Sequence, residues 1–294
     1  MQEMQLARPL ATIFSLVSFL LFFISYSYCA ELKRETAAAF DKYVSATEAR
    51  MSGELRPGGV FLYIDGLSGD RRNSAYRQLA AKEVFIAPLQ TTLNGKDISV
   101  SGGLIHHWVG VIFIPDSNLS TVLPVVQNYG NRAEVYKPDV IASRLISRQG
   151  DDYKIFLRFF QKKFTTVVLN TEFDIHWHQL DSSHVYSNSY STRIAEVKDP
   201  DKPDGPELPP GKDHGYLWRL FTYWRFEEKD GGVYMQCEVI SLTRDIPFGF
   251  GWLLRPLVTS IPRQSLTRTL TQTRVVILEQ QASSEEHTPN KAKE

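Results

Sequence analysis

Apolar and polar side chains alternate along most of the second half of the chain. In residues 171–180 the two kinds occupy opposite parities: Phe173, Ile175 and Trp177 against Glu172, Asp174, His176 and His178. A period of two is typical of a β-strand with one buried face. Segments of strand character cover residues 104–114, 139–147, 153–160, 165–180, 183–197, 216–228 and 232–244. Together they predict an antiparallel sheet of about seven strands.

Two segments have helical rather than strand periodicity. The first follows residue 115, and Pro124 predicts that it is kinked or split in two. The second covers residues 248–277, with an apolar stripe formed by Leu254, Leu257, Val258, Ile261, Leu266 and Leu270. A long antiparallel sheet curls, and its concave face needs an apolar cover. We therefore predict an α+β fold in which the last helix closes a curved sheet and encloses a cavity.

The remaining segments are less regular. Residues 31–103 are predicted as a small α+β extension, with helices at 31–51 and 73–81, a strand at 60–64 and a hairpin at Asn94–Gly95. The proline-rich, charged residues 198–215 are predicted as an exposed loop or flap. Residues 281–294 are polar and are predicted to be a disordered tail after a domain covering 104–280.

The N-terminus carries an almost continuously apolar run over residues 10–28. Such a run is expected of a secretory signal peptide, here residues 1–30, and it is also nearly long enough for a membrane anchor of ~20 residues. Both interpretations predict that the rest of the chain is exported, periplasmic or secreted, with membrane association through this segment in the second case. Cys237 is then the one cysteine outside this region, and it is interpreted as a small buried hydrophobe.

Composition limits the classes of partner. Lysine plus arginine and aspartate plus glutamate number 33 each, so the net charge is zero. A nucleic-acid-binding protein normally shows a basic stripe, so we expect no nucleic-acid partner. The 294 residues, of which 43% are apolar, can bury a substantial core.

The order of elements resembles the START-like helix-grip superfamily, which is also called the polyketide cyclase and lipid-transfer superfamily. The resemblance covers residues 104–277 and is most specific at residues 233–266, where a last strand, a short turn and a long helix follow one another. Asp245, Pro247 and Gly249 occupy the turn, and residues 252–270 form the helix that closes the cavity. Members of this superfamily bind sterols, phospholipids, quinones or plant hormones, and some are cyclases, dehydratases or hydrolases. The resemblance implies the fold more strongly than any one activity.

Strand parity predicts which residues line the enclosed space. We assign the bulky apolar or aromatic parity of each strand to the interior, because an unpaired buried charge is costly. The predicted lining is Trp177, Tyr186, Asn188, Tyr190, Trp218, Thr222, Trp224, Met235, Leu254, Val258 and Ile261. Apolar walls with a few polar groups are typical of a pocket for an apolar or amphipathic molecule. The alternative interpretation is that these aromatic residues simply fill the core.

The opposite parity carries the charges and is predicted to be a solvated surface of mixed sign. It comprises Glu172, Asp174, His176, His178, Arg193, Arg219, Arg225 and Glu238. Two histidines at i and i+2, with Asp174, could bind a divalent metal, but this spacing is common on exposed strands and we predict no metal site. His106 and His107 are adjacent and should point to opposite faces.

Three functions remain open from the sequence. The first is a binding protein for a lipid-like, sterol-like or quinone-like molecule, with no cofactor. The second is an enzyme on the same scaffold, in which Tyr186, Asn188, Tyr190 and His184 supply inward acid–base groups. The third is an envelope interaction protein with a filled core. No linear catalytic or phosphate-binding motif appears in the chain.

Overall fold

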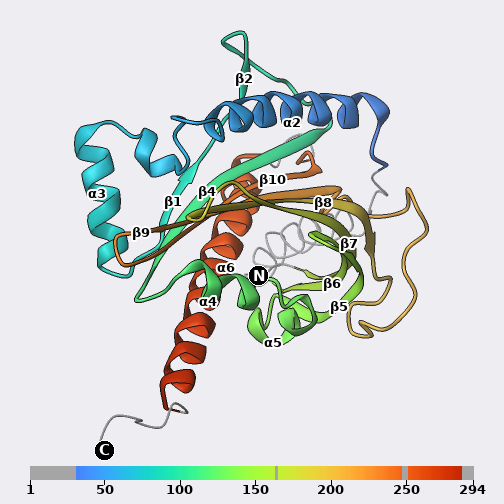
Figure 1. Ribbon diagram of the computed structural model, residues 1–294. Helices are drawn as coiled ribbons and strands as arrows, with labels where there is room; N and C mark the ends of the chain where they lie inside the picture. Colours follow the sequence, from blue (N-terminus) through green and yellow to red (C-terminus); the bar gives the residue numbers. More distant parts are fainter. Residues whose placement is uncertain (1–30, 163–164, 247–250, 287–294) are drawn as a thin grey trace, which may run out of the picture.

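The computed structural model describes residues 31–162, 165–246 and 251–286, with the backbone alone for 251–259 and 284–286. Its centre is an eight-stranded antiparallel sheet with the strand order β1-β4-β10-β9-β8-β7-β6-β5. The strands are β1 (Phe85–Pro88), β4 (Gly103–Pro115), β5 (Val140–Gln149), β6 (Asp152–Lys162), β7 (Thr166–Gln179), β8 (His184–Glu196), β9 (Arg219–Lys229) and β10 (Gly232–Arg244). The sheet curls around the long helix α6 (Gly251–Glu286) (Figure 1). The predicted α+β arrangement of a curved antiparallel sheet closed by the last helix is confirmed, and the eighth strand is β1, which comes from the N-terminal extension. The enclosed cavity stays a prediction.

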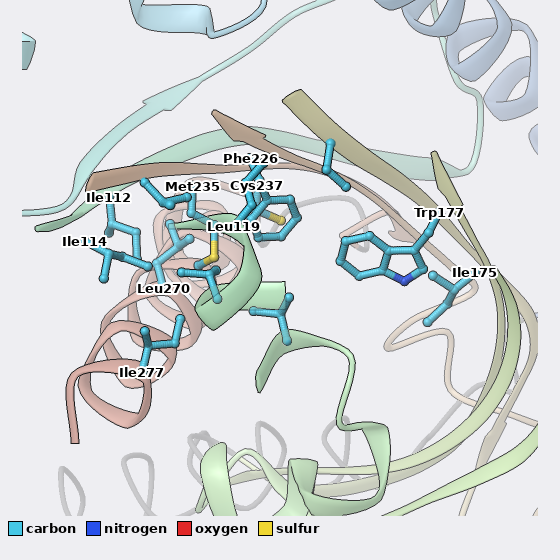
Figure 2. Close-up of a cluster of buried hydrophobic side chains, with 14 of the residues drawn as sticks. Ile112, Ile114, Leu119, Ile175, Trp177, Phe226, Met235, Cys237, Leu270 and Ile277 are labelled. Atoms are coloured by element: carbon cyan, nitrogen blue, oxygen red, sulfur yellow. The ribbon is translucent and has the colours of Figure 1, made fainter. Parts of the chain in front are cut away.

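The face toward α6, called the inner face here, holds the larger apolar core. Leu266, Leu270 and Ile277 of α6 pack in one cluster with Ile112 and Met235 of the sheet (Figure 2). Gly110 on β4 makes this contact possible, because an added Cβ would lie 2.5 Å from Leu270 Cδ1. The split helix completes the cover as α4 (Leu119–Val126), the 3₁₀ turn η2 (Tyr129–Asn131) and α5 (Arg132–Val135).

The opposite face, called the outer face, is also covered. Helix α2 (Arg34–Glu54) crosses it, and the 3₁₀ turn η1 (Tyr63–Gly66) and helix α3 (Gly69–Ala80) lie beside it (Figure 1). Phe40, Tyr43 and Val44 of α2 pack with Ile240 and Leu242 of β10. Successive residues of β10 therefore serve two different cores, because side chains alternate between the faces of a strand. This explains why all eleven residues from Gly232 to Leu242 are buried.

Several local predictions differ from the structure. Residues 60–64 form no strand, and their end belongs to η1. Helix α3 starts at Gly69 rather than at residue 73, and Asn118 caps α4 with a capping box. The hairpin at Asn94–Gly95 is confirmed between β2 (Thr92–Leu93) and β3 (Lys96–Asp97), where φ is 53° and 73°.

The predictions for the two ends of the chain have different outcomes. Helix α6 continues to Glu286, so the predicted disorder from residue 281 is wrong for residues 281–286. The rest of that tail, the apolar N-terminal run and the Pro247–Gly249 turn lie outside the described residues. Among the described helices none is long and apolar enough to cross a membrane. The division of the chain at residue 103 stays a prediction.

Candidate ligand-binding site

Small side chains occupy the inner face of β8. On β8 the inner parity carries Ser187 and Ser189, while the neighbouring strands carry large residues. Ser187 lies between Trp177 of β7 and Trp224 of β9, and Ser189 lies between Ile175 and Thr222. Ser187 and Ser189 are 1% and 6% exposed, so other side chains cover both of them.

The side chains around Trp177 are closely packed. Trp177 is 7% exposed, and its Nε1 donates a hydrogen bond to the Tyr129 hydroxyl at 2.9 Å. Burial raises the pKa of Tyr129 to about 12, so its hydroxyl stays protonated. Phe226 stacks on Trp177 with the ring centroids 5.5 Å apart. Trp177 is therefore part of the packed core.

Other apolar side chains of the inner face are less buried. Four large apolar side chains pack against the inner core yet stay only half-buried: Leu157, Phe159, Leu220 and Trp224. Thr222, between Leu220 and Trp224 on the same parity, is half-buried as well. A closed core buries such residues fully, so this wall offers apolar surface to another molecule or to the first turns of α6.

Polar groups are sparse on the inner face and are not all paired. Among the described residues, Ser187 Oγ and Tyr153 OH are buried without a hydrogen-bond partner. His106 is 4% exposed on the inner parity of β4, and its Nε2 lies 3.1 Å from Thr243 Oγ1. Burial lowers the pKa of His106 to about 4, which keeps the ring neutral near pH 7. A few isolated polar groups among apolar side chains are typical of pockets for largely apolar ligands.

The predicted inward register was wrong for β8. His178 pairs with Tyr186, His176 with Asn188 and Asp174 with Tyr190, so Tyr186, Asn188 and Tyr190 share the outer face with the histidines. Bulk was a misleading criterion here, because the outer face is itself covered by α2 and accommodates tyrosines. These residues, and His184, which shares their parity, therefore supply no acid–base group to the interior.

Trp218 is a second correction. It precedes β9 and belongs to the outer cluster with Phe40 and Tyr43 rather than to the inner face. Its indole Nε1 donates to Asp213 Oδ1 at 3.1 Å. The polar end of the indole is thus bound by the proline-rich loop.

The other predicted lining residues divide into three groups. Thr222 and Trp224 lie on the half-buried inner wall, as predicted, whereas Met235 is fully buried in the inner core. Ile261 is a half-buried residue of α6. The side chains of Leu254 and Val258 lie outside the described residues. That any of these residues contacts a ligand stays a prediction.

Sequence reasoning missed the serines, Leu157, Phe159 and His106. The signal for the serines was the run "SNSYS" at residues 187–191, in which small side chains recur at every second position. On a strand, such a recurrence places the small side chains on one face.

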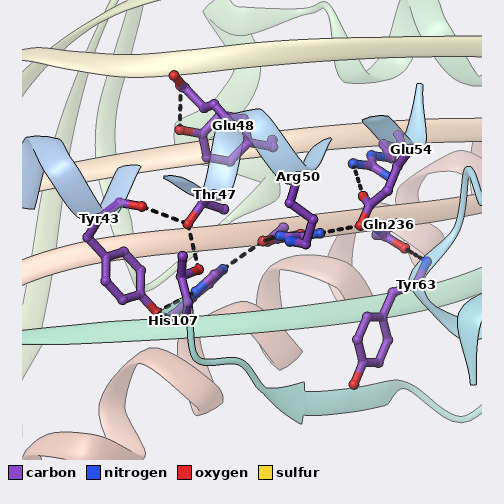
Figure 3. Close-up of polar contacts among 12 residues, drawn as sticks. Tyr43, Thr47, Glu48, Arg50, Glu54, Tyr63, His107 and Gln236 are labelled. Atoms are coloured by element: carbon purple, nitrogen blue, oxygen red, sulfur yellow. Dashed lines mark hydrogen bonds and ion pairs between the residues drawn. The ribbon is translucent and has the colours of Figure 1, made fainter. Parts of the chain in front are cut away.

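The predicted solvated surface is partly a buried polar interface under α2. Arg225 and Glu238 are 3% and 1% exposed. Arg225 Nη2 donates to Glu54 Oε2 at 2.7 Å, and Arg50 pairs with both Glu54 and Glu238 (Figure 3). The prediction failed here because charged side chains of α2 neutralise those of the sheet. It holds for His178 and Arg193, which are exposed.

His107 completes this interface. Its Nδ1 lies 2.9 Å from Tyr43 OH, and its Nε2 lies 2.7 Å from Glu238 Oε1 (Figure 3). Because Thr91 N–H donates to Tyr43 OH, the tyrosine proton is directed to Nδ1, and Nε2 then donates to Glu238. Burial raises the pKa of the Glu238 carboxyl, but His107, Arg50 and Arg225 outweigh burial and hold it below its usual value. His106 and His107 do point to opposite faces, as predicted.

The two histidines of β7 have separate partners. His176 Nδ1 lies 2.7 Å from Asp152 Oδ1, and His178 stacks on Tyr186 with the ring centroids 4.6 Å apart. Within the described part of the chain, no group of three or more histidine, cysteine, aspartate or glutamate residues is arranged to hold a metal ion.

Two hollows open on the α2 side. The larger, of about 360 Å³, lies between the start of α2, the end of β8 and the proline-rich loop, and Glu196, Asp213 and Trp218 contribute to it. The loop is anchored there, because Glu196 accepts hydrogen bonds from His214 N at 2.9 Å and from His214 Nδ1 at 2.7 Å. The smaller, of about 180 Å³, lies between α2, β8 and β9.

Comparisons with known proteins give similarity in structure only. No protein-family model matches the sequence, and no curated protein matches it either. Among solved structures, the STAR-related lipid transfer protein fragment of Xanthomonas axonopodis is 15% identical with a TM-score of 0.42, over 65% of this chain and 98% of that one. Human STARD10 is 10% identical with a TM-score of 0.42, over 76% and 85%. The Zhui aromatase/cyclase of Streptomyces sp. R1128 is 7% identical with a TM-score of 0.39, over 59% and 94%.

The topology itself defines the architecture. Seven strands from β4 to β10 form one antiparallel sheet, a split helix follows the first of them, and a long helix follows the last and packs on the inner face. This is the order of elements from which the resemblance was predicted. The chain has the START-like helix-grip fold.

Proposed function

We propose that the protein binds an apolar or amphipathic small molecule between the inner face of its sheet and α6. The observation that carries this proposal is the half-buried wall of Leu157, Phe159, Leu220 and Trp224. Burying apolar area yields ~25 cal/mol per Å², so a ligand that covers this wall gains affinity without any covalent step.

The polar groups nearby suit an amphipathic ligand. Ser241 of β10 pairs with His106 on one side and with Leu220 on the other, so His106 lies in the same cross-strand row as the wall. A neutral imidazole offers one donor and one acceptor nitrogen. One of these is available for a carbonyl or hydroxyl of the ligand while the other stays with Thr243.

Native mass spectrometry of the purified full chain tests the proposal. The expected result is a bound species of lipid-like mass that is lost in Thr222→Trp, because the added indole occupies the space beside Leu220 and Trp224. Thr192→Trp, on the exposed part of the neighbouring strand, is the matched control and should retain the bound species.

The stability of the Thr222→Trp variant gives an independent test of the proposal. If the wall borders open space, Thr222→Trp should cost little stability, whereas overpacking a closed core costs ~1–3 kcal/mol. A destabilised Thr222→Trp, together with a wild-type chain that carries no ligand and takes up no added fatty acid, would contradict the proposal.

We also propose that the chain is exported and acts in the periplasm or outside the cell. The support is the apolar run at residues 10–28, which suits either a cleaved signal or a membrane anchor. Cell fractionation followed by N-terminal sequencing distinguishes the two. A mature N-terminus near residue 30 indicates cleavage, an intact chain in the membrane fraction indicates an anchor, and an intact chain in the cytosol contradicts export.

A further inference from the structure

The smaller hollow on the outer face has a carboxylate on one wall. Glu48 of α2 contributes it, and its Oε1 accepts hydrogen bonds from Tyr190 OH at 2.9 Å and from Tyr223 OH at 2.8 Å. Burial, followed by the negative charge of Glu48, raises the pKa of both tyrosines. The hydroxyls therefore stay neutral donors, and they hold the carboxylate in place without compensating its charge.

The nearby cations, including Arg225, which itself lines the hollow, are paired with other groups. Arg225 directs Nη1 to Phe61 O at 2.6 Å and Nη2 to Glu54, and Arg50 pairs with Glu54 and Glu238. Two arginines thus face two glutamates, and among the ion pairs of the described residues none includes Glu48. A half-buried carboxylate without a cation leaves one uncompensated negative charge at the hollow.

Aromatic rings form much of the remaining wall. The rings of Tyr190 and Tyr223 are nearly perpendicular, at 83°, with the centroids 6.1 Å apart. Tyr186 also lines the hollow and is supported from behind by its stack on His178. Asn188 lies opposite Tyr223 on the neighbouring strand and adds an amide.

We propose that this hollow binds a small organic cation, an amine or quaternary ammonium ion. Aromatic rings attract such a cation through the negative faces of their π systems, and the attraction grows when water is excluded. Glu48 supplies the opposite charge, and for an N–H cation also a charge-assisted hydrogen bond. A volume of about 180 Å³ is sufficient for a small ammonium ion. The site lies on the face opposite the proposed apolar ligand, so the two sites are independent.

Isothermal titration of the full chain with tetramethylammonium, and separately with methylammonium, tests the proposal. Neutral tert-butanol, similar in size to tetramethylammonium, is the ligand control. Saturable binding of at least one cation, with no binding of tert-butanol, is the expected result. Equal binding of tert-butanol, or no saturable binding of either cation, would overturn the proposal.

Variants locate the binding. Glu48→Gln keeps an oxygen acceptor for both tyrosines and removes the charge, so it should fold normally and weaken cation binding at least tenfold. Glu172→Gln, a half-buried carboxylate on the same sheet face, should leave the affinity unchanged. Thr222→Trp should also leave it unchanged, which separates this site from the inner face. An unchanged affinity in a folded Glu48→Gln variant would overturn the assignment.

Discussion

Each face of the sheet is covered by a helix, but the contacts on the two faces differ in chemistry. The inner face meets α6 through aliphatic and aromatic side chains, whereas the outer face meets α2 through both an apolar cluster and a chain of ion pairs and hydrogen bonds. Apolar contact tolerates sliding and exchange of partners, while a buried ion pair fixes one geometry. We therefore propose different roles for the two faces. Helix α2 fixes the position of the sheet, and the inner face binds the proposed apolar ligand, which can exchange.

The largest expected effect is on the outer face. Glu238→Ala leaves Arg50, Arg225 and His107 without their shared carboxylate, and removing one partner of a buried ion pair costs ~3–5 kcal/mol. Glu172→Ala, whose carboxylate lies 3.9 Å from Lys154, should cost less than ~1 kcal/mol. Urea unfolding monitored by circular dichroism measures both. Equal losses of stability in the two variants would contradict the proposal that the ion pairs under α2 fix the position of the sheet.

On the inner face the corresponding change is Leu270→Ala. This residue is 0% exposed, and truncating a buried leucine costs ~2–5 kcal/mol. Val275→Ala on the same helix, 45% exposed, should change stability by less than ~0.5 kcal/mol. If Leu270→Ala behaved like Val275→Ala in the same urea series, α6 would not be packed on the sheet as described.

The pH dependence of stability tests the burial of neutral His106 on the inner face. The pKa of His106 is lowered from 6.5 to about 4 in the folded chain, so protonation favours the unfolded chain as the pH falls through this window. At ~1.36 kcal/mol per pKa unit, this one residue should remove ~3 kcal/mol of stability between pH 7 and pH 4. His106→Asn should therefore lose less stability than the wild type over that range. Parallel curves for the two proteins would show that His106 is not buried in neutral form.

A smaller effect is expected at the closest approach of helix and sheet. Gly110→Ala places a Cβ 2.5 Å from Leu270 Cδ1, and either the leucine or α6 must move, at a cost of ~1–3 kcal/mol. Gly53→Ala is the matched control, because an added Cβ there meets nothing within 4 Å. Thermal unfolding should separate the two variants. A stable Gly110→Ala protein would mean that α6 is free to shift on the inner face.

The fold could be predicted largely because its determinants are local in the sequence. Alternation predicted the strands and Asn94–Gly95 predicted the hairpin, whereas Pro124 lies inside α4 and the helical segment is interrupted only after Val126. The inner parity of Trp177, Thr222, Trp224 and Met235 was also predicted correctly, since these residues lie on strands with one clearly apolar face.

The site was less predictable because the outer face has its own cover. Parity cannot tell which covered face a tyrosine belongs to, so Tyr186 and Tyr190 were assigned to the wrong side. The burial of Arg225 and Glu238 depends on partners on α2, more than 170 positions away in the sequence, and no local pattern encodes that contact. The position of Ser187 between Trp177 and Trp224 likewise follows from the strand register and not from a local pattern.

The most direct test of the central claim asks which face of the sheet binds the apolar ligand. Tryptophan fluorescence can be measured while the full chain is titrated with a dibrominated fatty acid, whose bromine atoms quench indoles at short range. We predict quenching that is reduced strongly in Trp224→Phe, on the inner wall, and preserved in Trp218→Phe, on the outer face. Quenching that survives in Trp224→Phe and disappears in Trp218→Phe would place the ligand under α2 and contradict the account.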